Sequence, residues 1–177
     1  MTKNIFWVVV LSFCFTVILI NFFGVKQSPN IPAPDVVVDS TYLSKKIAMY
    51  NVLARYNSPL VHEVDSFLNA CLTYRIDCYL LPSISGVEST FGQQYLVGTY
   101  NVFGWGGGYI AFQSWEDSFL QIAKGLRFNY INRNLTSIEE IAHVYAPPST
   151  TWSRNVQFFL SRFYQQEMQI IQPIFNL

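Results

Sequence analysis

Residues 84–108 constrain the fold most strongly, because they join a helical pattern directly to a segment too rich in glycine to be helical. The stretch reads ISGVESTFGQQYLVGTYNVFGWGGG, and its single acidic residue is Glu88. Within residues 100–109, four glycines and one asparagine are interleaved with four aromatic residues. A glycine inside a helix costs about 1 kcal/mol relative to alanine. We therefore expect a helix that carries Glu88 and ends at Gly92, followed by a long irregular loop.

The chain beyond residue 39 repeats apolar residues at the three- and four-residue steps of amphipathic helices. These patterns predict about six helices, which begin near residues 40, 58, 79, 114, 137 and 151. A length of about 150 residues suits one domain. We therefore expect a single, mainly α-helical domain over residues 39–173.

Local signals predict where several helices begin and end. Residues 114–117 (SWED) and 137–140 (SIEE) are capping-box-like pairs that predict helix starts. Thr151 is the expected cap of the last long helix, and Pro173 is its expected end.

The N-terminus contains 21 consecutive uncharged residues, 5–25, between Lys3 and Lys26. One crossing of a bilayer takes about 20 apolar residues. A cleaved signal peptide has a shorter apolar core of about 7–15 residues and small residues at its cleavage site, which this run lacks. We therefore expect residues 1–25 to be an uncleaved single-pass anchor with the domain on the extracytoplasmic side, and secretion after cleavage is the alternative. Residues 26–38 contain three prolines and are expected to form an extended spacer.

Cys71 and Cys78 are the two cysteines outside the apolar N-terminal run. On one continuous helix they would lie too far apart for a disulfide. A helix break at residues 75–77 would bring them together, and an oxidising compartment would favour the bond. The sequence leaves open a disulfide and a pair of buried thiols.

Charge and histidine content exclude several classes of function. The formal net charge is zero and only 12% of residues are charged, so we expect no nucleic-acid partner. His62 and His143 lie far apart in sequence and have no cysteines at metal-ligand spacing. The glycine loop lacks the Gly-Lys-Ser/Thr of a phosphate-binding loop. We therefore expect neither a metal nor an organic cofactor.

Glu88 is the candidate catalytic residue. It lies four residues after Ile84 and seven after Leu81, on or beside the apolar stripe of its helix. It also falls in the last helical turn, where the helix dipole disfavours a negative charge. Both effects raise the pKa of a carboxyl group, and a carboxyl protonated near neutral pH is what a general acid requires. The alternative is a glutamate at the edge of the stripe that reaches solvent.

The glycine loop offers groups suited to binding a sugar. Asn101 can donate and accept hydrogen bonds to an acetamido or hydroxyl group. Tyr100, Phe103 and Trp105 offer flat faces for stacking on sugar rings, and Tyr145 offers a further hydroxyl. The alternative is an ordinary tight loop whose aromatic side chains fill the core, and for Phe103 this alternative is favoured.

Four short segments in sequence order resemble a known family. They are residues 86–92 (GVESTFG), 101–104 (NVFG), 112–115 (FQSW) and 145–152 (YAPPSTTW). Their types and order are similar to those of bacterial glucosaminidase-like domains of the lysozyme superfamily, in which a helical glutamate precedes an Asn-x-Phe-Gly loop. The resemblance covers about residues 58–165.

The resemblance implies a lysozyme-like α-domain that binds peptidoglycan and cleaves its glycan strand beside N-acetylglucosamine. Glu88 would be the general acid, and Asn101 would belong to the substrate loop. A non-catalytic glycan-binding or scaffolding domain is the alternative, and an anchored protein-interaction domain is a third. The chain lacks the Gly-Leu-Met-Gln segment that typical lytic transglycosylases place after their glutamate, which makes that activity a more distant alternative.

A second catalytic carboxylate is not apparent. The next acids after Glu88 are Glu116 and Asp117, which the start of a helix already explains. Two-carboxylate glycosidases keep their acids about 5–10 Å apart. Without such a partner, the substrate's own acetamido group or a bound water would complete the reaction.

Overall fold

The computed structural model describes residues 40–175, which belong to one compact unit of residues 38–177. The described part of the chain is all α-helical, with six α-helices, three short 3-10 helices and no strand, so the predicted mainly α fold is confirmed. The elements in chain order are α2 (Ser40–Arg55), η1 (Pro59–Glu63), α3 (Val64–Tyr74), α4 (Leu80–Ser89), η2 (Trp105–Gly108), α5 (Trp115–Asn129), η3 (Ile131–Arg133), α6 (Ile138–Tyr145) and α7 (Trp152–Phe175).

The predicted anchor of residues 1–25 and the spacer of residues 26–38 lie outside the described residues. Among the helices that are described, none has both the length and the apolar character needed to span a membrane.

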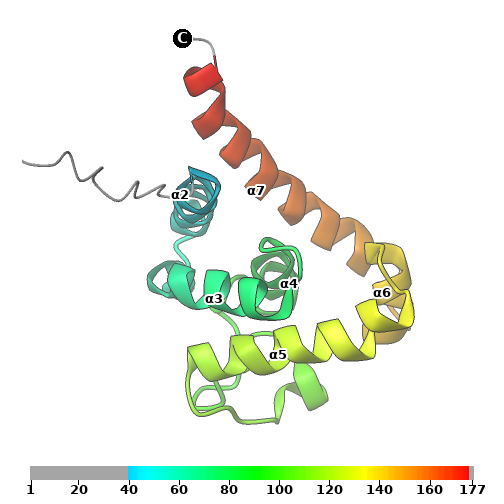
Figure 1. Ribbon diagram of the computed structural model, residues 1–177. Coiled ribbons are helices and arrows are strands. Elements are labelled where there is room, and N and C mark those ends of the chain that lie inside the picture. The colour runs from blue at the N-terminus through cyan, green and yellow to red at the C-terminus, as the bar shows by residue number, and fades with distance from the viewer. Residues whose placement is uncertain (1–39, 176–177) are drawn as a thin grey trace, which may run out of the picture. The chain divides into compact units, whose positions relative to one another are not determined.

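The long helix α7 organises the domain. It packs against α2, α4 and α6, whereas α3 and α5 lie side by side (Figure 1). Helix α4, which carries Glu88, contacts α7, α3 and α5. The candidate catalytic residue therefore projects from an element that is held on several sides.

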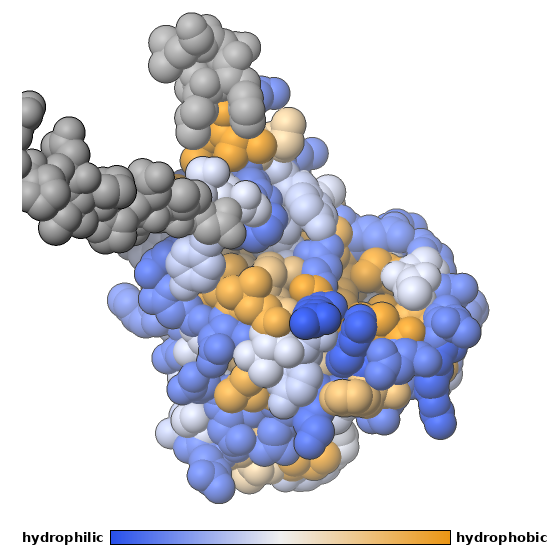
Figure 2. Space-filling view, viewed as in Figure 1, coloured by the Kyte–Doolittle hydropathy of each residue, from blue (hydrophilic) through white to orange (hydrophobic). Residues whose placement is uncertain are grey.

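Stacked aromatic rings form much of the core. Phe67 of α3 stacks on Phe119 of α5 with ring centroids 3.9 Å apart, and Tyr79 stacks on Phe163 of α7 at 5.3 Å. All four rings are fully buried, and burial of one such side chain stabilises a fold by roughly 1.5–3 kcal/mol. Hydrophilic side chains cover most of the face shown in Figure 2, with apolar ones scattered among them.

Two predicted helix starts are confirmed. The Ser114 hydroxyl accepts a hydrogen bond from the Asp117 backbone N–H at 3.1 Å at the start of α5. Residues 137–140 form a complete capping box at the start of α6. These signals are correct because both partners lie within one helical turn.

The start of α7 lies where the sequence predicts it, and its end does not. The helix begins at Trp152, directly after Thr151, and the hydroxyl of Ser149 accepts a hydrogen bond from the Trp152 backbone N–H at 3.1 Å. The helix also continues past Pro173 to Phe175. The fixed backbone angle of proline is itself helical, so the prediction that Pro173 ends the helix is wrong.

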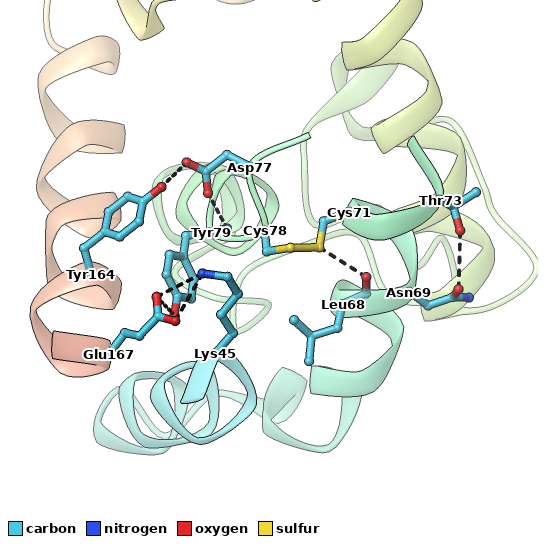
Figure 3. The surroundings of a disulfide bond; sticks show 10 residues. All are labelled: Lys45, Leu68, Asn69, Cys71, Thr73, Asp77, Cys78, Tyr79, Tyr164 and Glu167. Atoms are coloured by element: carbon cyan, nitrogen blue, oxygen red, sulfur yellow. Dashed lines mark hydrogen bonds and ion pairs between the residues drawn. A yellow bond between two sulfur atoms is a disulfide. The ribbon is translucent and has the colours of Figure 1, made fainter. Parts of the chain in front are cut away.

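A chain reversal at residues 75–77 joins the two cysteines. Helix α3 ends at Arg75, which adopts a left-handed conformation with φ of 51°. The reversal brings the Cα atoms of Cys71 and Cys78 to 4.9 Å, and a disulfide joins them (Figure 3). The bond ties the end of α3 to the segment that leads into α4.

A buried carboxylate beside this disulfide connects three parts of the domain. Glu167 of α7 accepts hydrogen bonds from the Ser44 hydroxyl at 2.8 Å and the Tyr79 hydroxyl at 2.8 Å, and it pairs with the Lys45 ammonium at 3.1 Å. Figure 3 shows Lys45 and Tyr79 converging on Glu167. We call Ser44, Lys45, Tyr79 and Glu167 the Glu167 cluster.

Candidate active site

Glu88 lies in the last turn of α4 and is half-buried. Its Oε1 accepts a hydrogen bond of 2.6 Å from the indole N–H of Trp152, the first residue of α7. Burial raises the pKa of the Glu88 carboxyl above its ordinary value, and the hydrogen bond from Trp152 opposes that shift. Glu88 therefore keeps its proton to a higher pH than an exposed glutamate does.

A turn of unusual backbone conformation follows α4 directly after Glu88 and Ser89. Helix α4 ends at Ser89, earlier than expected, because both Thr90 and Phe91 adopt left-handed conformations with φ of 52° and 56°. Such angles strain a residue that has a Cβ atom. Here the buried Phe91 ring packs against Phe159 of α7, with centroids 4.8 Å apart, and this contact helps to hold the turn.

The second carboxyl oxygen of Glu88 faces the glycine loop. A Cβ atom at Gly104 would stand 3.1 Å from Oε2 of Glu88, and Gly104 has a φ of +68°. A side chain at this position would be strained and would crowd the carboxyl. Gly104 also lines a cavity of about 370 Å³, so the Glu88 carboxyl lies next to one wall residue of that cavity, although Glu88 does not itself line it. The other residues that line it are Trp105, Gly106, Gly107, Tyr130 and Tyr145.

Trp105 forms one aromatic wall of this cavity and rests on α5. A Cβ atom at Gly125 of α5 would lie only 2.1 Å from Cη2 of Trp105. The indole can therefore occupy its place only because position 125 has no side chain. Trp105 is half-buried, which leaves part of its surface available to a ligand.

Tyr145 connects the cavity to the loop and to Glu88. Its hydroxyl donates a hydrogen bond of 2.7 Å to the backbone carbonyl of Phe103, and its ring stacks on Trp152 at 4.9 Å. Burial raises the pKa of Tyr145 well above its usual range, and the nearby Glu88 carboxylate adds to the shift. Tyr145 therefore stays protonated near neutral pH, and its hydroxyl holds the backbone of the loop at Phe103.

Asn101 stabilises the conformation of the glycine loop. Its side-chain N–H groups donate to the backbone carbonyls of Trp105 at 2.8 Å and Ile110 at 3.0 Å, and its carbonyl accepts from the Trp105 backbone N–H at 3.1 Å. Asn101 is only 2% exposed. Because both N–H groups are used inside the loop, Asn101 holds the cavity wall and has no free donor to offer an acetamido group.

Phe103 is a candidate sugar contact by sequence, but its ring fills the core, which is the alternative that the sequence favours for this residue. The residue is fully buried, and its ring meets Phe119 of α5 edge to face with centroids 5.7 Å apart. The ring anchors the loop to the core. Its backbone carbonyl, which accepts from Tyr145, is its contribution to the site.

Tyr100 lies at the start of the loop with a φ of 54°. Its half-buried ring packs edge to face on Trp115 of α5, with centroids 5.2 Å apart. Tyr100 is not among the residues that line the cavity.

Neither of the acids that follow Glu88 in sequence is free to assist it. Asp117 accepts hydrogen bonds from the Gln113 backbone N–H and the Gln121 side chain, both at 3.0 Å, and the first of these lowers the pKa of Asp117. Glu116 accepts a hydrogen bond from Asn69 at 3.2 Å. In the described part of the chain, no group of three or more histidines, cysteines or acidic residues could hold a metal ion.

Three residues of the site escape prediction from sequence. Trp152 is the last residue of the segment 145–152 that resembles the family, but no sequence pattern indicates that its indole nitrogen donates to Glu88. No sequence feature marks Gly125, within α5, or Tyr130, directly after that helix, as a site residue. Their roles depend on contacts between elements that are distant in sequence.

Comparison of the chain with models of known protein families finds no match, and no curated protein or solved structure matches it significantly. The geometry around Glu88 therefore provides the support for a functional proposal.

Proposed function

We propose that this domain is a glycosidase that cleaves a peptidoglycan-type glycan strand beside N-acetylglucosamine, with Glu88 as the general acid. The observation that carries the proposal is a half-buried carboxyl with a raised pKa that lies next to Gly104, a residue that lines an aromatic-walled cavity. Pockets of about 300–1,000 Å³ are typical of small-ligand sites, and this cavity of about 370 Å³ falls in that range. We also propose that the all-α fold is lysozyme-like.

The two oxygens of Glu88 would have different tasks. Oε1 is held by the indole N–H of Trp152, so Oε2, beside Gly104, would carry the transferable proton. Its transfer to the glycosidic oxygen would accompany cleavage of the bond between that oxygen and the anomeric carbon. A water molecule would then add hydroxide to this carbon, directly or after attack by the substrate's acetamido oxygen, and return its remaining proton to Glu88.

A non-catalytic glycan-binding or scaffolding domain is the second candidate. It is favoured by the engagement of Glu116 and Asp117 at the start of α5, which leaves Glu88 without an evident carboxylate partner among the described residues. Aromatic surfaces such as that of Trp105 would serve binding alone equally well. The two candidates differ in whether a glycan is cut.

The test is digestion of purified peptidoglycan by the full-length protein and by Glu88→Gln, with mass spectrometry of the products. General acid catalysis contributes about 10²–10⁴-fold, so E88Q is expected to lose at least about 100-fold in rate while still binding sacculi. Glu116→Gln is the matched control, because this acid is held outside the cavity, and it should keep parental activity. No cleavage by the parent protein on several peptidoglycan types would favour the binding domain. An anhydro product would indicate a lytic transglycosylase.

We further propose that residues 5–25 anchor the domain on the extracytoplasmic side. The disulfide between Cys71 and Cys78 supports this side, because such bonds persist in oxidising compartments. Protease treatment of intact spheroplasts should digest the domain, whereas protection until lysis would contradict the proposed orientation.

A further inference from the structure

A second cavity, of about 240 Å³, lies between α2 and α7 and shares no lining residue with the one beside Glu88. Its lining is dominated by hydrogen-bond donors and contains no acidic side chain. The residues are Val52, Arg55, Tyr56, Arg162, Gln165, Gln166 and Gln169.

The two arginines bring positive charge that no described carboxylate neutralises. Only two ion pairs occur in the described part of the chain, and both involve lysines. The guanidinium of Arg162 lies 4.9 Å from the centre of the Phe158 ring, a cation–π contact that steadies it without removing its charge. The acid nearest to Arg162 in sequence is Glu167, which forms an ion pair with Lys45 in the Glu167 cluster.

Gln166 presents a buried polar group that lacks a partner. The residue is only 7% exposed, and its amide oxygen is buried without a hydrogen-bond partner in the described part of the chain. An amide oxygen accepts hydrogen bonds. A ligand that donates a hydrogen bond to this oxygen would give it the partner that it lacks.

We propose that this cavity binds an oxyanion, a carboxylate or phosphate group on a small ligand. Arg55 and Arg162 supply charge-assisted hydrogen bonds to the anion, and the Gln166 amide oxygen accepts a hydrogen bond from an N–H or O–H group of the same ligand. The volume lies below the range of about 300–1,000 Å³ typical of drug-sized ligands, which suits an anionic group with a short organic tail. The site is independent of the proposed glycosidase activity.

The experiment is calorimetric titration of the full-length protein at constant ionic strength with inorganic phosphate, acetate and N-acetylglycine. N-acetylglycinamide, which lacks the negative charge, is the ligand control. Saturable binding of phosphate alone assigns a phosphate ligand, and saturable binding of the carboxylates alone assigns an organic acid. We expect Arg55→Gln and Arg162→Gln each to weaken the binding at least tenfold.

Two further variants separate a binding role from a structural one. Arg154→Gln is the matched control, since Arg154 is an exposed arginine on the same helix, and it should bind like the parent. Gln166→Leu should weaken the binding of N-acetylglycine while leaving the melting temperature unchanged or raised, because it removes an unpaired buried amide oxygen. The proposal is overturned if no anion binds saturably, if R55Q and R162Q bind like the parent, or if R154Q weakens binding equally.

Discussion

At the scale of single residues, Glu88 and Trp152 act as one unit. Burial alone would push the Glu88 carboxyl strongly toward its protonated form, and the indole N–H restrains this by stabilising the carboxylate. The same hydrogen bond fixes the orientation of the carboxyl. Trp152 therefore sets both the direction and the acidity of the proposed proton donor.

Replacing Trp152 by phenylalanine tests this pairing. The variant loses the only contribution that lowers the pKa of Glu88, so this pKa should rise. Since a general acid works in its protonated form, the alkaline limb of the pH profile of kcat/KM should move to higher pH. At pH values below that limb, kcat/KM of the variant should be lower than that of the parent by less than the factor of about 100 expected for E88Q. An alkaline limb that stays in place or moves to lower pH would show that Glu88 does not titrate in the rate profile.

Glu88→Gln has a complementary effect on stability. The folded-state pKa of Glu88 is raised, so between the unfolded and folded pKa values the native state binds more protons than the unfolded state does. Stability is therefore greatest below the ordinary glutamate pKa and falls as pH rises through the folded pKa. E88Q removes this loss, so near pH 7 its free energy of unfolding, measured by urea denaturation, should equal or exceed that of the parent. A marked destabilisation would mean that the carboxylate is needed for folding.

At the scale of elements, the glycine loop owes its shape to its neighbours. Asn101 ties the loop to itself, Phe103 anchors it in the core, and Gly125 lets Trp105 rest on α5. The loop thus presents Trp105 to the cavity from a fixed position. A small change on α5 should disturb the cavity without touching a residue that contacts Glu88.

Gly125→Ala is that change. Alanine favours a helix by about 1 kcal/mol over glycine, but its Cβ would meet the Trp105 ring and displace it. A displacement of about 1 Å in a site can cost up to about 100-fold in rate, so we expect a loss of about 10- to 100-fold in glycan cleavage with the fold retained. Lys124→Ala, an exposed neighbour on α5, is the control. If G125A kept the parental activity, Trp105 would not be a substrate contact.

The elements that sequence predicts correctly are those determined locally. The caps of α5 and α6 and the break after α3 depend on residues within one or two turns, and each is present. The left-handed Thr90 and Phe91 are not predictable in this way, because packing of Phe91 against α7 helps to hold that turn.

The candidate site likewise contains features that nearby residues determine and features that depend on contacts distant in sequence. The loop after α4 returns to its own helix and brings Gly104 close to Glu88. The donor on Trp152 lies 64 positions from Glu88, and no local pattern indicates it. The sequence favours a core position for Phe103, which is confirmed, whereas the hydrogen bonds of Asn101 within the loop depend on which carbonyls surround it.

At the scale of the whole domain, the Glu167 cluster and the Glu88–Trp152 contact lie on different parts of α7. Glu167 binds α2 and the segment before α4, whereas Trp152 binds the end of α4. Tyr79, buried within the cluster, has a strongly raised pKa, chiefly through burial and then through its hydrogen bond to Glu167. Its proton therefore stays in that hydrogen bond over the whole physiological range, and the link between α4 and α7 does not depend on pH through Tyr79.

Glu167→Ala should destabilise the domain far more than loss of an exposed ion pair. It leaves the Tyr79 and Ser44 hydroxyls without their acceptor and removes the partner of Lys45, and removing one member of a buried pair costs about 3–5 kcal/mol. Lys45 is 27% exposed in its side chain and can turn toward water, so we expect a fall of about 2–4 kcal/mol in the free energy of unfolding.

Asp65→Asn is the matched control for this variant, because Asp65 of α3 pairs with Lys46, the residue after Lys45 on α2, and both side chains are exposed. Exposed pairs contribute about 0–1 kcal/mol, so D65N should unfold within that margin of the parent. At temperatures where E167A is still folded, its pH profile of glycan cleavage should match the parent's, since the Trp152 end of α7 is held by its own contacts with Tyr145 and Glu88. If the pH profile of E167A were shifted, the Glu167 cluster would determine the position of Trp152. A change at one end of α7 would then alter the position of its other end.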